Sequence, residues 1–348
     1  MKIHKLKGIL IAGALLAQSV AWAGNPQRAG SAGAPELLIN PWARSSGWGG
    51  VNIANVRGVE ATFLNIAGIA YTEKTEVAFS NTQWLLGGGI SINAAGLTQK
   101  VGQNGVMTAS FTSFDYGSWT RTTGQNPEGG IGEVSPTTAI IGLGYSQKFL
   151  ESIRGGILIK IYNSSLVDMN ATAACVDAGV QYVTGKKDQF KFGITLRNVG
   201  PAASYQGDGQ AVTLPVPQGG FAQAFEERSA DFEIPATLSI GGSYDITNLR
   251  SQRITLAAAF QSNSFEKDQY FVGAEYSLKE RVSARVGYRI FDNRSYEVST
   301  SVFTGLSAGL SLEMPLSDNN RNRLSIDYGF QATNTFDGVH SFGISFAL

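Results

Sequence analysis

The sequence predicts an all-β protein, a transmembrane antiparallel β-barrel of about fourteen strands. Three observations predict this fold. The chain begins with a secretory signal, it continues as segments of alternating hydrophobicity about ten residues long, and long and short links between the segments largely alternate. Composition agrees, because charged residues make up only 16% of the chain and Gly is its commonest residue, with 42 copies.

The secretory signal occupies residues 1–23. Three lysines precede an apolar run at 8–17, and the small-residue site Ala21-Trp22-Ala23 follows. We therefore expect cleavage near Ala23 and export to the bacterial outer membrane. The remaining chain has a formal charge of −3, which indicates neither nucleic acid nor an anionic membrane surface as a partner.

The strand pattern is clearest at 302–314, where Leu306 and Leu310 share one face while Ser307 and Ser311 share the other. A soluble sandwich also alternates in this way. Repeated strands of about ten residues instead suit a tilted crossing of a bilayer, because globular strands centre on five or six residues. The fourteen predicted strands are 75–82, 85–95, 105–114, 137–147, 153–163, 173–183, 189–198, 235–245, 252–261, 269–278, 281–290, 302–314, 321–332 and 339–348.

The links between these strands predict an orientation. Barrels of this kind have short periplasmic turns and longer outer loops, so 115–136 and 199–234 are the expected outer loops and both barrel termini are expected in the periplasm. Two links break the pattern. The first hairpin, at Gln83-Trp84, is too tight for an outer loop, and about nine residues follow the second strand.

We divide the chain into a signal peptide (1–23), an N-terminal segment (24–74) and the barrel (75–348). The N-terminal segment is rich in Gly and aromatic residues. Two interpretations stay open for it: a hatch or plug in the barrel mouth, or a periplasmic extension that covers the base of the barrel.

Three motifs in and after this segment resemble the PorV/PorQ family of outer-membrane proteins. They are ARSSGWGG at 43–50, NIAGIA at 65–70 and EVAFSNTQWL at 76–85. Three positions depart from the family pattern. This chain has Trp48 where the family has Met, Ile66 where it has Pro, and Asn81 where it has His.

The resemblance implies a fold similar to the fatty-acid transporter FadL, a fourteen-stranded barrel with an N-terminal hatch. Asn65, Ala67 and Gly68 would form the hatch motif. PorV-type members belong to the type IX secretion system, in which they bind a large translocon protein of the SprA or Sov type and receive the signal domains of secreted cargo. FadL-type members instead pass hydrophobic small molecules.

Enzymatic and metal sites are not expected. After the signal peptide the chain has one histidine, His340, and one cysteine, Cys175. This leaves too few ligands for a usual zinc site, and we expect no cofactor. A hydrolase would have to depend on His340. The simpler interpretation is a structural histidine at the membrane–water interface and a small wall residue at Cys175.

Charged residues on the predicted lumen face carry both signs. Cross-strand pairing is their default interpretation, and ion selectivity is the alternative. The residues are Lys160, Lys191, Arg197, Glu275, Arg285, Arg289, Arg323 and Asp327.

The loop 199–234 is the strongest candidate for partner binding, because loops of this length are usually functional or disordered. Its aromatic residues are Tyr205, Phe221, Phe225 and Phe232. We therefore expect a non-enzymatic type IX secretion component that contacts outer-membrane lipid, the translocon and secreted cargo. A channel for hydrophobic small molecules is the alternative function.

Overall fold

The computed structural model describes most of the chain beyond the predicted signal peptide, which lies outside the described residues. These are 26–28, 30–215, 219, 221–226, 228–247, 251–291, 301–316 and 322–348. Among them, no helix has the length and apolar character needed to cross a membrane.

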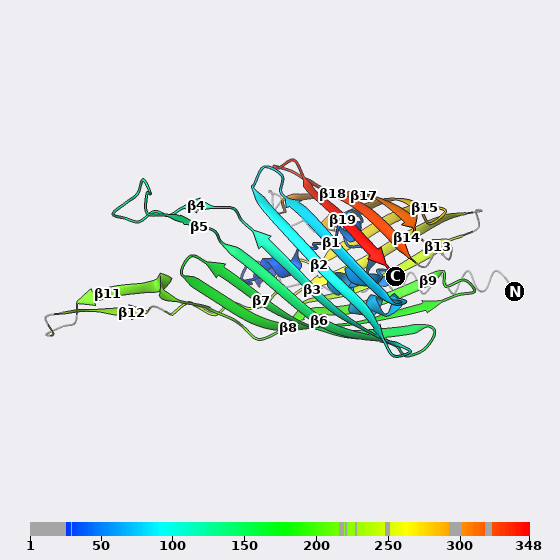
Figure 1. Cartoon of the computed structure of the whole chain (residues 1–348), viewed down its shortest axis with the longest axis horizontal. Helices are drawn as coiled ribbons and strands as arrows, with labels where there is room; N and C mark the ends of the chain where they lie inside the picture. The colour runs from blue at the N-terminus through cyan, green and yellow to red at the C-terminus, as the bar shows by residue number, and fades with distance from the viewer. Residues whose placement is uncertain are drawn as a thin grey trace.

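Fourteen strands form one closed antiparallel barrel, which confirms the predicted fold class (Figure 1). Each strand pairs with its neighbours along the chain, and β1 pairs with β19 to close the ring. The strands are β1 (Thr75–Trp84), β2 (Ile90–Val101), β3 (Gly105–Asp115), β6 (Thr137–Lys148), β7 (Ile153–Leu166), β8 (Met169–Thr184), β9 (Phe190–Val199), β13 (Thr237–Ile246), β14 (Gln252–Asn263), β15 (Gln269–Leu278), β16 (Val282–Phe291), β17 (Phe303–Pro315), β18 (Arg323–Thr333) and β19 (Val339–Ala347).

The structure corrects the two links that broke the predicted pattern. Gln83 and Trp84 do not form a turn, because both pair with β2, and the chain turns over 85–89, where Leu85 has φ 50°. The link after β2 is only 102–104. The predicted nine-residue link after the fifth strand is also wrong, since β7 and β8 are joined by Val167 and Asp168 alone.

The two ends of the barrel differ mainly in two long links, which both lie at the same end. One end, here the terminus end, carries Thr75, the C-terminus and short turns such as 149–152. The opposite end, here the loop end, carries the links 116–136 and 200–236. Two small sheets project from the loop end: β4 (Trp119–Thr120) with β5 (Glu133–Val134), and β11 (Ala211–Pro215) with β12 (Ala222–Glu226) (Figure 1).

Residues 34–72, here the lumen segment, lie inside the barrel, where Figure 1 shows them in blue. Trp48, Val51 and Ile53 pack there against wall residues Ala257 and Phe271. The segment consists of short helical turns: η2 (Pro35–Leu38), α2 (Ala43–Ser46), η3 (Asn52–Ala54), η4 (Gly58–Glu60), α3 (Ala61–Leu64) and η5 (Ile66–Tyr71); a further turn, η1 (Pro26–Arg28), precedes it.

Glycines in the wall allow α2 to approach the barrel backbone directly. A Cβ at Gly329 would overlap the carbonyl oxygen of Ala43, and Gly309 faces Gly47 in the same way. The backbone of the lumen segment thus lies directly against the backbone of the wall, and only glycine in the wall leaves room for this contact.

This contact gives a prediction for Gly329→Ala. The added methyl group should displace α2 and lower the free energy of unfolding by about 1–3 kcal/mol, the usual cost of overpacking. Urea titration of the folded barrel in lipid, followed by tryptophan fluorescence, measures the change. Gly242→Ala is the matched control, because the nearest atom to a Cβ there is 3.7 Å away. Equal stability of the two variants would contradict the close fit.

Candidate functional site: the lumen and the loop end

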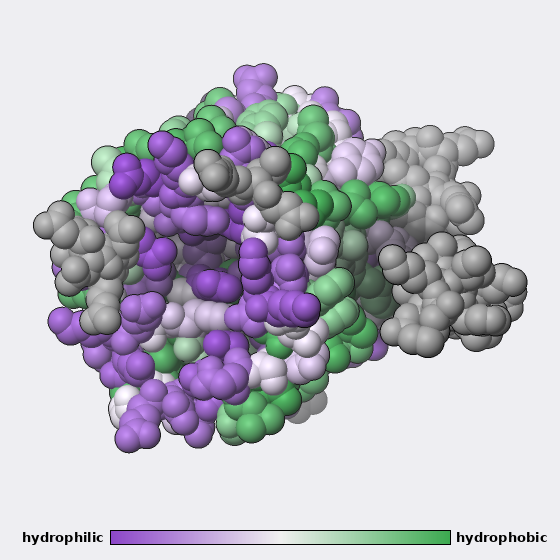
Figure 2. All heavy atoms as spheres, turned by 90° about the vertical axis from the view of Figure 1, so that its right-hand side faces the viewer, coloured by the Kyte–Doolittle hydropathy of each residue, from purple (hydrophilic) through white to green (hydrophobic). Residues whose placement is uncertain are grey.

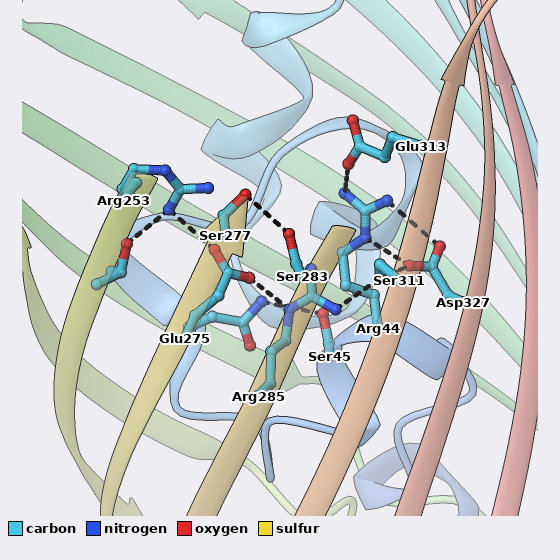
Figure 3. Close-up of polar contacts among 12 residues, drawn as sticks. Arg44, Ser45, Arg253, Glu275, Ser277, Ser283, Arg285, Ser311, Glu313 and Asp327 are labelled. Carbon is cyan, nitrogen blue, oxygen red and sulfur yellow. Dashed lines mark hydrogen bonds and ion pairs between the residues drawn. The ribbon is translucent and has the colours of Figure 1, made fainter. Parts of the chain in front are cut away.

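A chain of charged and hydroxyl side chains joins α2 to five wall strands (Figure 3). Glu275 pairs with Arg253 at 2.9 Å and with Arg285, whose Nη1 donates to Ser311 at 2.5 Å. Ser311 in turn donates to Asp327. Three of the predicted lumen charges, Glu275, Arg285 and Asp327, therefore belong to one network.

Arg44 connects this network to the lumen segment. Its guanidinium contacts Asp327 at 3.0 Å and Glu313 at 3.1 Å. Arg44 projects from α2 between the strands that carry the two carboxylates (Figure 3). Hydrogen-bonded pairs of this kind are costly to break once buried, because the remaining charge has no partner.

Glu60 holds the other side of α2. Its carboxylate accepts hydrogen bonds from the Ser45 hydroxyl at 2.6 Å and from the backbone N–H of Arg44 at 3.3 Å. Burial raises the pKa of Glu60 to about 7, although the charge of Arg44 opposes the shift. The side chain therefore acts as a hydrogen-bond acceptor for α2.

A second group of charges lies where the wall ladder is irregular, between β8 and β9. Lys160 pairs with Asp177 at 2.8 Å and donates to the side chain of Asn198. Asn198 has φ 59° and donates to the carbonyl of Leu37 in the lumen segment. The predicted charge Lys160 is thus part of the attachment of the lumen segment to the wall.

Two other predicted lumen charges lie at the ends of the network that contains Arg44. Lys191 pairs with Asp245 at 2.5 Å, and Asp245 is joined to Arg253 through the Thr255 hydroxyl. Arg323 reaches Glu313 at 3.8 Å near the terminus end. Arg197 donates to the carbonyl of Phe63 at 2.9 Å. These charged residues therefore pair with residues of other strands or of the lumen segment, and they do not give the lumen a lining of one sign. Arg289 differs, since its guanidinium lies 5.2 Å from the Phe271 ring centre.

The predicted hatch motif forms a buried turn of the lumen segment. The Asn65 side chain accepts from the N–H of Ala67 at 3.2 Å and donates to the carbonyls of Ile53 and Val180. Ala67 is fully buried, and a Cβ at Gly68 would overlap the carbonyl oxygen of Val56. The motif therefore fixes the segment to itself and to β8.

The two halves of the lumen are filled differently. Towards the terminus end, the lumen segment and the polar network occupy it, and Figure 2 shows hydrophilic residues around a hollow at that end. Towards the loop end, a cavity of about 840 Å³ remains. Its lining includes the apolar side chains Leu38, Phe63, Trp84, Phe114, Phe271 and Phe303, together with Glu36 and Arg289.

The β11–β12 hairpin extends away from the barrel, and all ten of its strand residues are exposed (Figure 1). Val212 faces Phe225 and Leu214 faces Gln223, so these four side chains share one face. Val212, Leu214 and Phe225 are 42%, 50% and 45% exposed. The hairpin thus presents an apolar face and two strand edges with no partner among the described residues.

The four aromatic residues predicted to bind partners divide into two pairs. Tyr205, in β10 (Tyr205–Gln206), donates to Ser164 of the wall at 3.1 Å, and its ring packs on Phe232. Phe232 also packs against the cluster that contains Leu37. These two residues anchor the base of the loop. Phe221 and Phe225 remain exposed, at 60% and 45%.

His340 and Cys175 lie on different wall strands, β19 and β8. His340 Nδ1 lies 2.8 Å from the hydroxyl of Tyr328, and its Nε2 lies 3.1 Å from the carbonyl of Asp337. Cys175 is buried beside Tyr162. Arg44 and Glu60 were not predicted from the sequence as site residues, although Arg44 lies in the first motif.

Solved structures similar to this chain are outer-membrane transport barrels. They include the toluene transporter TbuX of Ralstonia pickettii (11% identity, TM-score 0.54, 88% of this chain and 98% of that chain) and a FadL homologue of Pseudomonas aeruginosa (12% identity, TM-score 0.52, 87% and 96%). At these identities the likeness shows the fold alone, and it confirms the predicted FadL-like barrel. No curated protein shows significant similarity to the chain.

One protein-family model matches residues 131–329, more than half of the chain: the type IX secretion system membrane protein PorP/SprF. The type IX association implied by the motifs is thereby confirmed, whereas membership of PorV/PorQ is not. Fold and family together support the predicted outer-membrane location, while cleavage near Ala23 stays a prediction. The chain belongs to the PorP/SprF family of type IX secretion system membrane proteins.

Proposed function

We propose that this chain is a non-enzymatic, PorV-like component of type IX secretion that binds the translocon or a secreted cargo protein at the loop end of its barrel. The observation that carries the proposal is the β11–β12 hairpin. It is held at its base by Tyr205 and Phe232, and it extends beyond the barrel with an apolar face exposed.

The hairpin is of a kind that gains stability from a partner. A two-stranded hairpin alone is marginally stable in water, and free strand edges are templates for pairing with another chain. A partner strand added to either edge would satisfy the free backbone groups, while Val212, Leu214 and Phe225 would lose water-exposed apolar surface. A β-rich secreted domain offers such an edge.

Replacing 211–226 with Gly-Gly tests this proposal while keeping Tyr205 and Phe232. We expect normal barrel assembly, judged by heat-modifiable electrophoretic mobility, together with loss of type IX secretion and of translocon co-purification. Unchanged secretion would refute the hairpin's role. Replacing 122–131, in the other projecting loop, with Gly-Gly is a control for the mere loss of an outer loop.

A finer test separates the two faces of the hairpin. Leu214→Ser combined with Phe225→Ser removes the apolar face, and secretion should fall as far as it does in the deletion. Thr213→Ser combined with Ala224→Ser changes the opposite face, since these two residues are paired there, and should leave secretion unchanged.

A second candidate function is a channel or receptor for hydrophobic small molecules, and the 840 Å³ loop-end cavity favours it. Pockets of a few hundred to a thousand Å³ with aromatic lining are typical of small-molecule sites. Passage towards the terminus end would require the lumen segment to move, because Arg44 and Glu60 hold it across that path.

The cavity can be tested with 1-aminoanthracene, an apolar fluorescent probe. Leu38→Trp should weaken probe binding at least about tenfold, because the larger ring fills part of the cavity. Leu86→Trp is the control, since Leu86 is exposed on the β1–β2 turn and does not line the cavity. Equal binding by both variants, or none by the unmodified protein, would remove this candidate.

A further inference from the structure

The outer wall of the barrel is not uniformly apolar. On β16 the outward residues Val282, Ala284, Val286, Tyr288 and Ile290 are apolar or aromatic without interruption. On β1 and β2 the outward sequence is interrupted by amides and hydroxyls. Asn81, Asn93 and Ser113 are direct cross-strand neighbours on β1, β2 and β3, and we refer to these three residues as the polar row.

The pairing register places the polar row on the outside. Asn81 is the direct partner of Phe342 on β19, which is 55% exposed on the outer wall. Paired residues of adjacent strands share a face. Asn93 is itself exposed, and Asn81 Nδ2 donates to Asn93 Oδ1 at 2.7 Å. This bond uses the oxygen of the Asn93 amide. Its Nδ2 group has no side-chain partner among the described residues.

The depth of the row conflicts with a wall covered by lipid alone. On β2 the outward residues between Asn93 and the next polar one, Gln99, are Ala95 and Leu97. Six residues of a strand tilted by about 40° span about 15 Å of membrane, whereas the apolar band of such barrels is about 25 Å tall. Wherever the band is placed, Asn93 or Gln99 of β2 meets hydrocarbon. Gln99 accepts from Thr75 at 2.7 Å and donates to the carbonyl of Lys100 at 3.2 Å, whereas an amide group left unpaired in hydrocarbon, as at Asn93, is costly.

The same wall has the features of a membrane-embedded protein contact. Interfaces within membranes favour small residues, which let walls approach closely, and Asn, Gln, Ser or Thr side chains, which hydrogen-bond across the contact. Ala95 and Ala109 lie outward beside the polar row, next to Leu97 and Phe111.

We propose that the outer wall of β1–β3 is covered by a second copy of this chain, related by a two-fold axis near Asn93. A two-fold interface brings the same surface patch together and must be self-complementary. Amide and hydroxyl groups both donate and accept, so the polar row can pair with its own counterpart. On β1 and β2, none of the outward residues from Thr75 and Gln99 to the loop end is charged. No residue there would therefore repel the same residue of the second copy.

Cysteine cross-linking in reconstituted bilayers tests the proposal. In a Cys175→Ala background, Asn93→Cys should give an oxidised, disulfide-linked band at twice the mass of one chain. Leu310→Cys, on the opposite wall and 57% exposed, is the matched control and should stay monomeric. A dimer yield at position 93 no higher than at position 310 would overturn the proposal.

A second measurement does not depend on disulfide geometry. Asn81→Leu combined with Asn93→Leu should keep the barrel folded, shown by heat-modifiable mobility, and should halve the mass of the particle measured by analytical ultracentrifugation in detergent. An unmodified protein that is already a monomer would overturn the proposal. A spin label at position 93 that is shielded from lipid in native membranes, but not in bilayers of the purified protein, would also overturn it. A different protein would then cover this wall.

Discussion

Closure of the ladder between β1 and β19 is the constraint on which the rest of the structure depends. Within hydrocarbon, every backbone N–H and C=O needs a partner inside the protein, and only a closed ring of strands supplies one along every edge. Closure also sends alternate side chains inward, and fourteen strands enclose more space than wall side chains of modest size can fill. The lumen segment fills the terminus-end half of that space. Its position explains why wall glycines such as Gly309 and Gly329 face the backbone of α2.

Much of the barrel was predictable because period-2 alternation is a local signal. The strands and their number follow from it, and the lengths of the links between the strands indicate how the two ends differ. Boundaries were missed where the local signal is weak. Residues 163–172 mix Asn, Ser and Thr, which suit both a strand that extends beyond the membrane and a loop, so β7 and β8 were placed too short. The first turn was misplaced because Leu85, a residue that rarely adopts positive φ, provides it.

The sites were less predictable, because they depend on contacts between distant parts of the chain. Asp327 was expected to face the lumen, yet its partner Arg44 is 283 residues away in sequence and lies on a segment whose location was open. Composition also could not separate the aromatic residues of the long loop. Tyr205 and Phe232 resemble Phe221 and Phe225 in sequence, and contacts with distant residues, such as the bond from Tyr205 to Ser164 and the packing of Phe232 near Leu37, show which pair is held at the barrel.

The arrangement of the lumen separates the two candidate functions by what each requires of the fold. Binding a protein through β11–β12 needs only a rigid base, which the anchors at Tyr205 and Phe232 provide, and it tolerates a lumen that stays closed. Moving a small molecule through the barrel requires α2 to leave the wall, which means separating Arg44 from Asp327 and Glu313 and exposing Glu60. Each such separation leaves a buried charge or acceptor without its partner, at a cost of several kcal/mol unless something replaces the lost contacts. A lumen segment held in this way is better suited to supporting a binding surface than to opening a pore.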